Sequence, residues 1–146
     1  SDASEADRQE VRNYVAAMEL GLARLREGRP ITLNLVLDLH AVLMAGVRGA
    51  DKSPGRFRTI QNWIGGRAIR DAVFVPPPPE LLTECLSDWE RFANAWDVMP
   101  DLVQCAVLHE QFEAIHPFVD GNGRMGRLLM TLFLIERGRL SQPLLY

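Results

Sequence analysis

The amino-acid sequence predicts a mainly α-helical bundle that carries one small β-hairpin. Apolar residues recur three and four positions apart in five segments, which is the spacing of helices buried on one side. Turn-forming residues are concentrated in a single stretch, residues 55–79. The chain has 146 residues, of which 47% are hydrophobic and 24% charged. It is therefore long and apolar enough to form one domain with its own core.

Two helices are expected in the N-terminal part of the chain. The first covers residues 5–28 and is ended by Gly28 and Pro30. Its apolar residues at helical spacing are Val11, Val15, Met18, Leu22 and Leu25. Thr32 is expected to cap the second helix, which ends at one of the two glycines, 46 and 49. The apolar side of this helix is formed by Leu35, Leu39, Val42 and Leu43.

The middle of the chain is predicted to be non-helical. Two short runs, "FRTIQNW" and "AVFV", flank the turn at Gly65 and Gly66, which indicates a β-hairpin or an irregular flap over about residues 56–76. Four consecutive prolines, residues 76–79, exclude regular helix and favour a stiff, extended connector. Two interpretations stay open for this region, a rigid loop and a solvent-side flap that holds a substrate.

Three further helices are expected after the prolines. The first begins at Glu80, and its apolar side is formed by Leu81, Leu82, Cys85, Leu86, Trp89, Phe92, Ala93 and Trp96. Asp101 follows a proline and is expected to cap the next helix, which ends where Pro117 disfavours helical geometry at His116. The apolar residues of this second helix are Val103, Ala106, Val107 and Ile115. The last helix starts around Gly123 and closes at Gly138.

Composition excludes several classes of protein. The net charge of −3 and the pI of about 5.6 argue against a general nucleic-acid binder, which would be basic. The apolar runs are too short to span a membrane, and the polar N-terminus has no secretory signal. Cys85 and Cys105 lie in apolar helical patterns, so we expect buried free thiols in a reducing, cytoplasmic compartment. We expect a fragment of a longer protein.

The stretch "HPFVDGNGRMGR", residues 116–127, is the strongest candidate for a functional site. Its glycines match the dinucleotide pattern GxGxxG, but a helix precedes them where that fold needs a strand, so the dinucleotide-binding fold is rejected. Glycines still allow successive backbone N–H groups to converge on an anion at the start of a helix. Arg124 and Arg127, three residues apart, can both donate to phosphate oxygens.

Two further residues in this stretch are candidates for catalysis. A carboxylate at Asp120 would repel a phosphate, unless a divalent cation such as Mg²⁺ lies between them. His116 titrates near neutral pH and can remove a proton from an attacking hydroxyl. Together these residues suit in-line transfer of a phosphorus-containing group. The alternative is a glycine-rich turn with solvated arginines and a histidine that only ends a helix.

This stretch resembles the signature of Fic-domain proteins, HxFx[DE]GNGRxxR, with every fixed position filled. The segments "VRNYVAAMELGL", "PGRFRTIQNWIGG", "FVPPPPEL" and "AVLHEQFEAIHPF" also resemble the family, so the likeness covers nearly the whole chain. It implies the Fic fold, a helical bundle with a β-hairpin flap, over residues 1–146, with the signature loop and helix at 116–137. It also implies a protein adenylyltransferase, which moves AMP from ATP to a Ser, Thr or Tyr hydroxyl of a target protein or of itself.

The resemblance implies a role for each signature residue. His116 would be the general base, Phe118 would anchor the loop in the core, and Asp120 would hold Mg²⁺ between the α- and β-phosphates. Asn122 would brace the α-phosphate, and Arg124 and Arg127 would bind the β- and γ-phosphates. The whole nucleotide-binding set is Gly121, Asn122, Gly123, Arg124, Gly126 and Arg127. The target-docking part of the flap would be Ile60, Gln61, Asn62, Trp63 and Ile64.

Many relatives also carry an inhibitory helix with the pattern [ST]xxxE[GN], whose glutamate engages the second arginine. Only "SDASEA", residues 1–6, approaches this pattern, and it has alanine at the last position. We therefore expect the inhibitory helix outside this chain or on a partner. The unvaried signature favours AMP transfer, but AMP removal, transfer of another nucleotide, and a nucleotide-binding module without turnover stay open.

Three other clusters are weaker candidates. His109, Glu110 and Glu113 near His116 do not have zinc-site spacing. Trp89 and Trp96 are expected in the core, and Trp63 at the substrate edge is the less favoured alternative to a structural role. The basic residues around the flap are expected on a solvated face, with recognition of an acidic target as the alternative; they are Arg48, Lys52, Arg56, Arg58, Arg67 and Arg70.

Overall fold

The computed structural model describes residues 2–46 and 52–142, which form a bundle of five α-helices with a long irregular excursion. The helices are α1 (Asp2–Arg26), α2 (Leu33–Leu43), α3 (Leu82–Ala93), α4 (Asp101–Ile115) and α5 (Asn122–Glu136). Two short 3₁₀ turns, Ile69–Asp71 and Pro79–Leu81, interrupt the excursion. The predicted fold class is confirmed, and each predicted helix is found.

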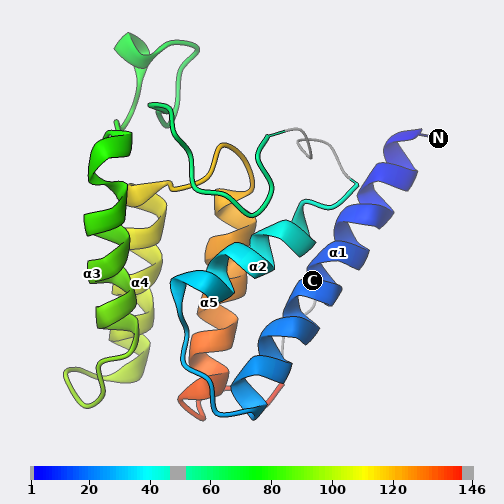
Figure 1. Ribbon diagram of the computed structural model, residues 1–146, viewed down its shortest axis with the longest axis vertical. Helices are drawn as coiled ribbons and strands as arrows, with labels where there is room; N and C mark the ends of the chain where they lie inside the picture. Colours follow the sequence, from blue (N-terminus) through cyan, green and yellow to red (C-terminus); the bar gives the residue numbers. More distant parts are fainter. Residues whose placement is uncertain (1, 47–51, 143–146) are drawn as a thin grey trace.

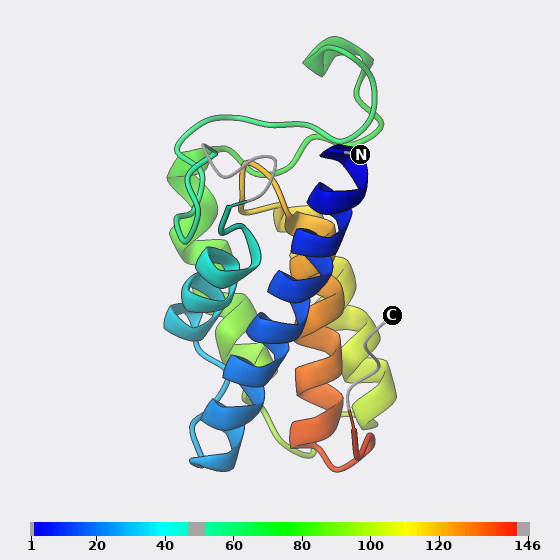
Figure 2. The same ribbon diagram turned by 90° about the vertical axis from the view of Figure 1, so that its right-hand side faces the viewer.

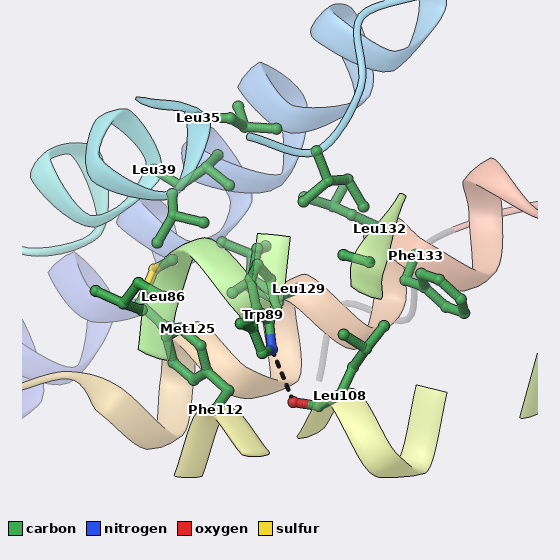
Figure 3. Close-up of a cluster of buried hydrophobic side chains, with 14 of the residues drawn as sticks. Leu35, Leu39, Leu86, Trp89, Leu108, Phe112, Met125, Leu129, Leu132 and Phe133 are labelled. Atoms are coloured by element: carbon green, nitrogen blue, oxygen red, sulfur yellow. Dashed lines mark hydrogen bonds between the residues drawn. The ribbon is translucent and has the colours of Figure 1, made fainter. Parts of the chain in front are cut away.

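Helix α5 is the centre of the bundle. It packs against α4 on one side and against α1 and α2 on the other, while α3 covers α4 (Figure 1). The core between these helices contains Leu39, Trp89, Phe112 and Leu132, and the indole N–H of Trp89 donates to the Leu108 carbonyl at 3.0 Å (Figure 3). Burying such side chains contributes about 1.5–3 kcal/mol each. This packing fixes α5, and so the position of its N-terminus.

Local signals explain where several helices begin and end. The Thr32 hydroxyl accepts the Leu35 N–H at 3.1 Å, so the predicted cap of α2 is confirmed. Gly28 and Gly138 have φ of +78° and +70° and close α1 and α5, as glycine does after a helix. Gly49, an alternative end for α2, lies outside the described residues.

Some predicted core positions were wrong. Val11 and Val103 are exposed, and Trp96 is 58% exposed because α3 ends at Ala93, before the periodic pattern does. Asp101 does not cap α4; it is the first residue of the helix, after Pro100. Its carboxylate instead accepts hydrogen bonds from Arg137 at 3.1 Å and Arg139 at 2.9 Å.

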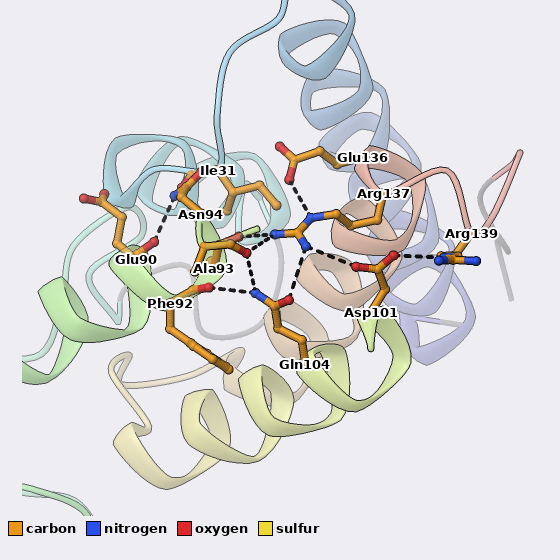
Figure 4. Close-up of polar contacts among 11 residues, drawn as sticks. Ile31, Glu90, Phe92, Ala93, Asn94, Asp101, Gln104, Glu136, Arg137 and Arg139 are labelled. Atoms are coloured by element: carbon orange, nitrogen blue, oxygen red, sulfur yellow. Dashed lines mark hydrogen bonds and ion pairs between the residues drawn. The ribbon is translucent and has the colours of Figure 1, made fainter. Parts of the chain in front are cut away.

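Arg137 organises the end of the bundle that lies away from the signature stretch (Figure 4). It is buried, and its guanidinium donates to Gln104 at 3.2 Å and to the carbonyls of Ala93 and Ala95 at 3.3 and 2.6 Å. Its guanidinium carbon also lies 3.9 Å from the centre of the Trp96 ring, a distance at which a cation attracts an aromatic face. The helices are therefore tied together at this end by polar contacts.

The flap, residues 56–76, leaves the bundle at the opposite end and folds back before α3 (Figures 1 and 2). The predicted hairpin is reduced to one antiparallel bridge, in which the Ile64 N–H donates to the Phe74 carbonyl at 2.9 Å. No longer ladder forms within residues 52–78. The physical reason is that the prolines after Val75 have no N–H to donate. Of the two predicted alternatives, a β-hairpin and an irregular flap, the structure has the irregular flap.

Candidate active site

The signature loop, residues 116–121, connects the C-terminus of α4 to the N-terminus of α5 and lies at the same end of the bundle as the flap (Figure 1). His116 adopts the left-handed conformation, with φ of 49° and ψ of 59°, which is uncommon for a residue other than glycine. Gly121, at the other end of the loop, has φ of 85° and caps the N-terminus of α5. Two left-handed residues thus reverse the chain, so that His116 and the first turn of α5 face one pocket.

The loop is anchored by Phe118 and Asn122. Phe118 is fully buried, and its backbone N–H donates to Asn122 Oδ1 at 2.9 Å. In return, Asn122 Nδ2 donates to the Phe118 carbonyl at 2.8 Å. The asparagine side chain is therefore used to hold the loop, and it lies inside the fold rather than extended into the pocket. The anchoring role expected of Phe118 agrees with this position.

His40 on α2 supports the loop from below, and the sequence did not single it out. Its ring stacks on Phe118 with 3.7 Å between ring centres. Nδ1 accepts the Gly55 N–H at 2.9 Å, so Nε2 must carry the proton that is donated to the Asp120 carbonyl at 2.8 Å. Burial lowers the pKa of His40, which keeps this neutral tautomer. His40 thereby fixes the backbone of Asp120.

Arg58 was expected on a solvated face, and this was wrong. The side chain is buried, and among the described residues its guanidinium donates only to main-chain carbonyls, at Ile60, Pro77, Ile115 and His116. A positive charge at the C-terminus of α4 is favourable because the free carbonyls there carry partial negative charge. No periodic pattern surrounds Arg58 in the sequence, so nothing local indicated its burial.

A pocket of about 310 Å³ opens at the N-terminus of α5. It is lined by His116, Val119, Asp120, Gly121, Asn122, Gly123, Arg124 and Arg127. The structure thus brings together every predicted catalytic, metal and phosphate residue except Gly126. Gly126 faces α4, where an added Cβ would lie 2.7 Å from Glu113 Oε1 and 3.2 Å from His109 Cδ2. Its lack of a side chain allows α4 and α5 to approach closely.

The start of α5 offers unpaired backbone donors to this pocket. The first bond of the helix runs from the Met125 N–H to the Gly121 carbonyl at 3.0 Å. The N–H groups of Asn122, Gly123 and Arg124 therefore have no acceptor within the helix, which is the arrangement that binds anions. The Gly121 N–H is used locally, since it donates to Asp120 Oδ1 at 2.8 Å.

The two arginine side chains of the pocket differ in burial and in their contacts. Arg124 Nη2 lies 3.5 Å from Met44 Sδ, and its Nη1 is buried without a partner among the described residues. Arg127 is exposed on the next turn and lies near Tyr14 of α1. Arg124 thus has a donor that a ligand oxygen can use, and the exposed side chain of Arg127 lines the same pocket.

His116 is half-buried at the pocket edge. Burial lowers the pKa of its imidazole, while the Glu113 carbonyl and carboxylate act in the opposite direction and the positive charge of Arg58 lowers the pKa further. The Glu113 carbonyl does not reach hydrogen-bond geometry, and Nδ1 is buried without a partner in the described part of the chain. The lowered pKa favours the neutral imidazole, which is the form that can accept a proton.

The five expected docking residues of the flap do not share one environment. Ile60 and Trp63 are exposed, and Ile64 forms the bridge to Phe74. Gln61 donates to the carbonyls of Asn62 and Pro76, both at 3.0 Å, which holds the two sides of the flap together. Asn62 points inward, and its Nδ2 donates to the His116 carbonyl at 3.1 Å.

Comparison with known proteins identifies relatives of this chain. The model of the Fic/DOC family matches residues 30–134. A protein from Drosophila erecta named protein adenylyltransferase Fic is 32% identical over 132 residues, which cover 86% of this chain and 25% of that protein. This chain therefore spans about a quarter of the length of the curated relatives it matches.

Solved structures agree in fold. A Fic domain containing signaling protein from Bacteroides thetaiotaomicron superposes with a TM-score of 0.78 at 23% identity, over 90% of this chain and 49% of that one. A Fic family protein from Desulfovibrio desulfuricans gives a TM-score of 0.72 at 31% identity, over 90% and 38%. Separately, no helix within the described ranges is both long and apolar enough to cross a membrane.

Proposed function

The chain belongs to the Fic/DOC family, and from that premise we propose that it is a protein adenylyltransferase domain. It transfers AMP from ATP to a Ser, Thr or Tyr hydroxyl of a target protein, self-modification included. Residues 1–146 form its single catalytic core, and we place it in the cytoplasm, where ATP is available and the free thiols of Cys85 and Cys105 stay reduced.

One arrangement carries this proposal: the imidazole of His116 and three backbone N–H groups that have no acceptor within α5 line the same pocket. The N–H groups of residues 122–124, with the positive end of α5, suit the α- and β-phosphates. Arg124 and Arg127 suit the outer phosphates, because a guanidinium can donate two hydrogen bonds to one phosphate group. A polyphosphate donor fits the full set, whereas a single phosphate would leave Arg127 unused.

His116 is the proposed general base. Its Nε2 takes the proton of the acceptor hydroxyl as the hydroxyl oxygen bonds to the α-phosphorus, and the bond from the α-phosphorus to pyrophosphate breaks. A proton on Nδ1 would leave Nε2 free for this step. The lowered pKa supports the role, since the base must be unprotonated at neutral pH.

Asp120 is the proposed ligand of Mg²⁺, held jointly with the phosphates of ATP. The fit is supported by its carboxylate, which lines the pocket and uses only Oδ1 in a hydrogen bond among the described residues. No group of three or more His, Cys, Asp or Glu side chains suited to a metal lies within residues 2–46 and 52–142. One carboxylate with substrate phosphates is a common arrangement for Mg²⁺. When bound, the ion neutralises phosphate charge.

The inhibitory element is proposed to come from outside this chain or from a partner. Glu5, the glutamate of the nearest matching pattern, lies on α1 and pairs with Arg12 at 2.9 Å and with Arg8 at 3.7 Å. Its carboxylate is therefore occupied on its own helix. A spontaneous, unrestrained self-modification of this chain is the expected result.

The donor and the metal are tested by incubating the chain with each of ATP, GTP, UTP and CTP, with Mg²⁺ or with EDTA. We expect label from ATP alone and only with Mg²⁺. Asp120→Ala should lose the Mg²⁺-dependent activity while keeping its fold, because the side chain lies at the pocket surface. Equal transfer from all four nucleotides, or activity of Asp120→Ala equal to wild type, would reject these assignments. Release of AMP from a modified protein would instead favour removal.

A further inference from the structure

Arg58 is a buried arginine whose described partners are all main-chain carbonyls. It is only 3% exposed, and no carboxylate pairs with it among the described residues. A buried guanidinium is costly unless its N–H groups are satisfied, so the carbonyls around it fix its position closely. A side chain held in this way also holds its partners in return.

Three of the carbonyls bonded to Arg58 are consecutive. Its Nη2 donates to Ile115 at 3.0 Å, its Nε to His116 at 2.7 Å, and its own backbone N–H to Pro117 at 2.8 Å. These residues surround the left-handed turn at His116. Since this conformation is unfavourable for a residue with a Cβ, contacts on both sides of it are needed to maintain it.

The remaining bonds of Arg58 go to Ile60 near the start of the flap and to Pro77 directly after it. Nη1 donates to the Ile60 carbonyl at 3.0 Å, and Nη2 to the Pro77 carbonyl at 2.7 Å. Asn62, inside the flap, donates to the same His116 carbonyl that Arg58 holds. The base of the flap and the backbone of the histidine therefore share one guanidinium.

We propose that Arg58, assisted by Asn62, is a positioning residue that sets the backbone of His116, and so the direction of its imidazole, according to the position of the flap. The effect of Arg58 on the rate of AMP transfer rests on the proposed function. The effect of Arg58 on the conformation of His116 does not. A target segment bound to the flap would thereby change the position of the His116 imidazole.

The test compares the whole chain as wild type, Arg58→Lys and Arg56→Gln. Lysine keeps the charge but cannot span four carbonyls. Arg56 is an exposed neighbour whose side chain forms no hydrogen bond or ion pair with the described residues, so it is the matched control. The measurements are thermal unfolding, calorimetric affinity for Mg²⁺-ATP, the rate of AMP transfer, and the NMR signals of the His116 ring, assigned with His116→Ala.

We expect Arg58→Lys to fold, to bind ATP within about threefold of wild type, and to transfer AMP about 10²-fold more slowly, because small misplacement of a catalytic group has that effect. Its His116 signals should shift, and those of Arg56→Gln should not. A folded Arg58→Lys with wild-type His116 signals would overturn the proposal. If wild type transfers no AMP, the proposed function fails while the NMR comparison still decides the role of Arg58.

Asn62→Ala is the second variant, for use if Arg58→Lys does not fold. It removes the other donor to the His116 carbonyl and leaves the guanidinium in place. The His116 signals of a folded Asn62→Ala should shift relative to wild type, because one of the two side-chain donors to the His116 carbonyl is lost. Unchanged signals in a folded Asn62→Ala would overturn the proposal that the flap base sets the histidine.

Discussion

Replacing His40 with phenylalanine would remove two hydrogen bonds from beneath the signature loop while keeping an aromatic ring stacked on Phe118. The Gly55 N–H would lose its acceptor and the Asp120 carbonyl its donor. Leaving a buried polar group unpaired costs about 1–3 kcal/mol. Since water can bond to part of these two groups, the substitution should lower the free energy of unfolding by about 2–4 kcal/mol in total. For a chain of this length that lowers Tm by about 5–15 °C.

The assay is urea or thermal unfolding of His40→Phe beside wild type, with His109→Phe as the matched control. His109 is half-exposed on α4, where its ring lies 3.6 Å from Glu113, so its replacement should change stability by less than about 0.5 kcal/mol. His40→Phe should also bind Mg²⁺-ATP more weakly, because Asp120 loses its backbone support. If His40→Phe were as stable as the control, the argument that His40 holds the loop would be refuted.

Three further outcomes are expected. The pKa of His40 is lower in the folded than in the unfolded state, so protonation of His40 favours unfolding. The difference in unfolding free energy between wild type and His40→Phe should therefore be largest above the usual histidine pKa of about 6.5 and decrease as the pH falls below it. Unfolding measured at pH 7.5 and at pH 5 checks this. Gly121→Ala should destabilise by about 1–3 kcal/mol, since φ is +85° and a Cβ would lie 2.9 Å from Met44 Sδ; calorimetric unfolding checks this. Arg127→Ala should leave Tm unchanged within about 2 °C because the side chain is exposed, yet weaken ATP binding in titration calorimetry; an unchanged affinity would remove Arg127 from the phosphate site.

The helices were predictable because apolar periodicity is a local property of the sequence. The pattern located α5 and its glycine boundaries, and Thr32 marked the start of α2. It failed at Trp96, since periodicity continues for one turn after α3 has ended. It failed at Asp101 because that carboxylate is used by two arginines near the end of the chain, which no local rule for helix caps includes.

The candidate site was predictable from the signature stretch, where glycines, arginines and a histidine occur together. Its supports were not. Arg58 lies among other basic residues in a turn-rich segment, and only the fold shows that it is buried against carbonyls that lie 57 positions away at Ile115 and 58 at His116. His40 lies in an ordinary helix, and its partner Asp120 lies 80 positions away. Long-range polar contacts of this kind leave no periodic trace in a single sequence.

The pocket at the start of α5 is proposed to transfer AMP with His116 as the general base. This proposal is tested most directly by incubating wild type and His116→Ala with Mg²⁺ and α-labelled ATP, alone and with a cell lysate, followed by intact mass and detection of the label. We expect wild type to gain AMP and His116→Ala to gain none while it still binds ATP. Equal labelling of both proteins would contradict the role of His116, and no labelling by wild type under either condition would contradict the activity itself.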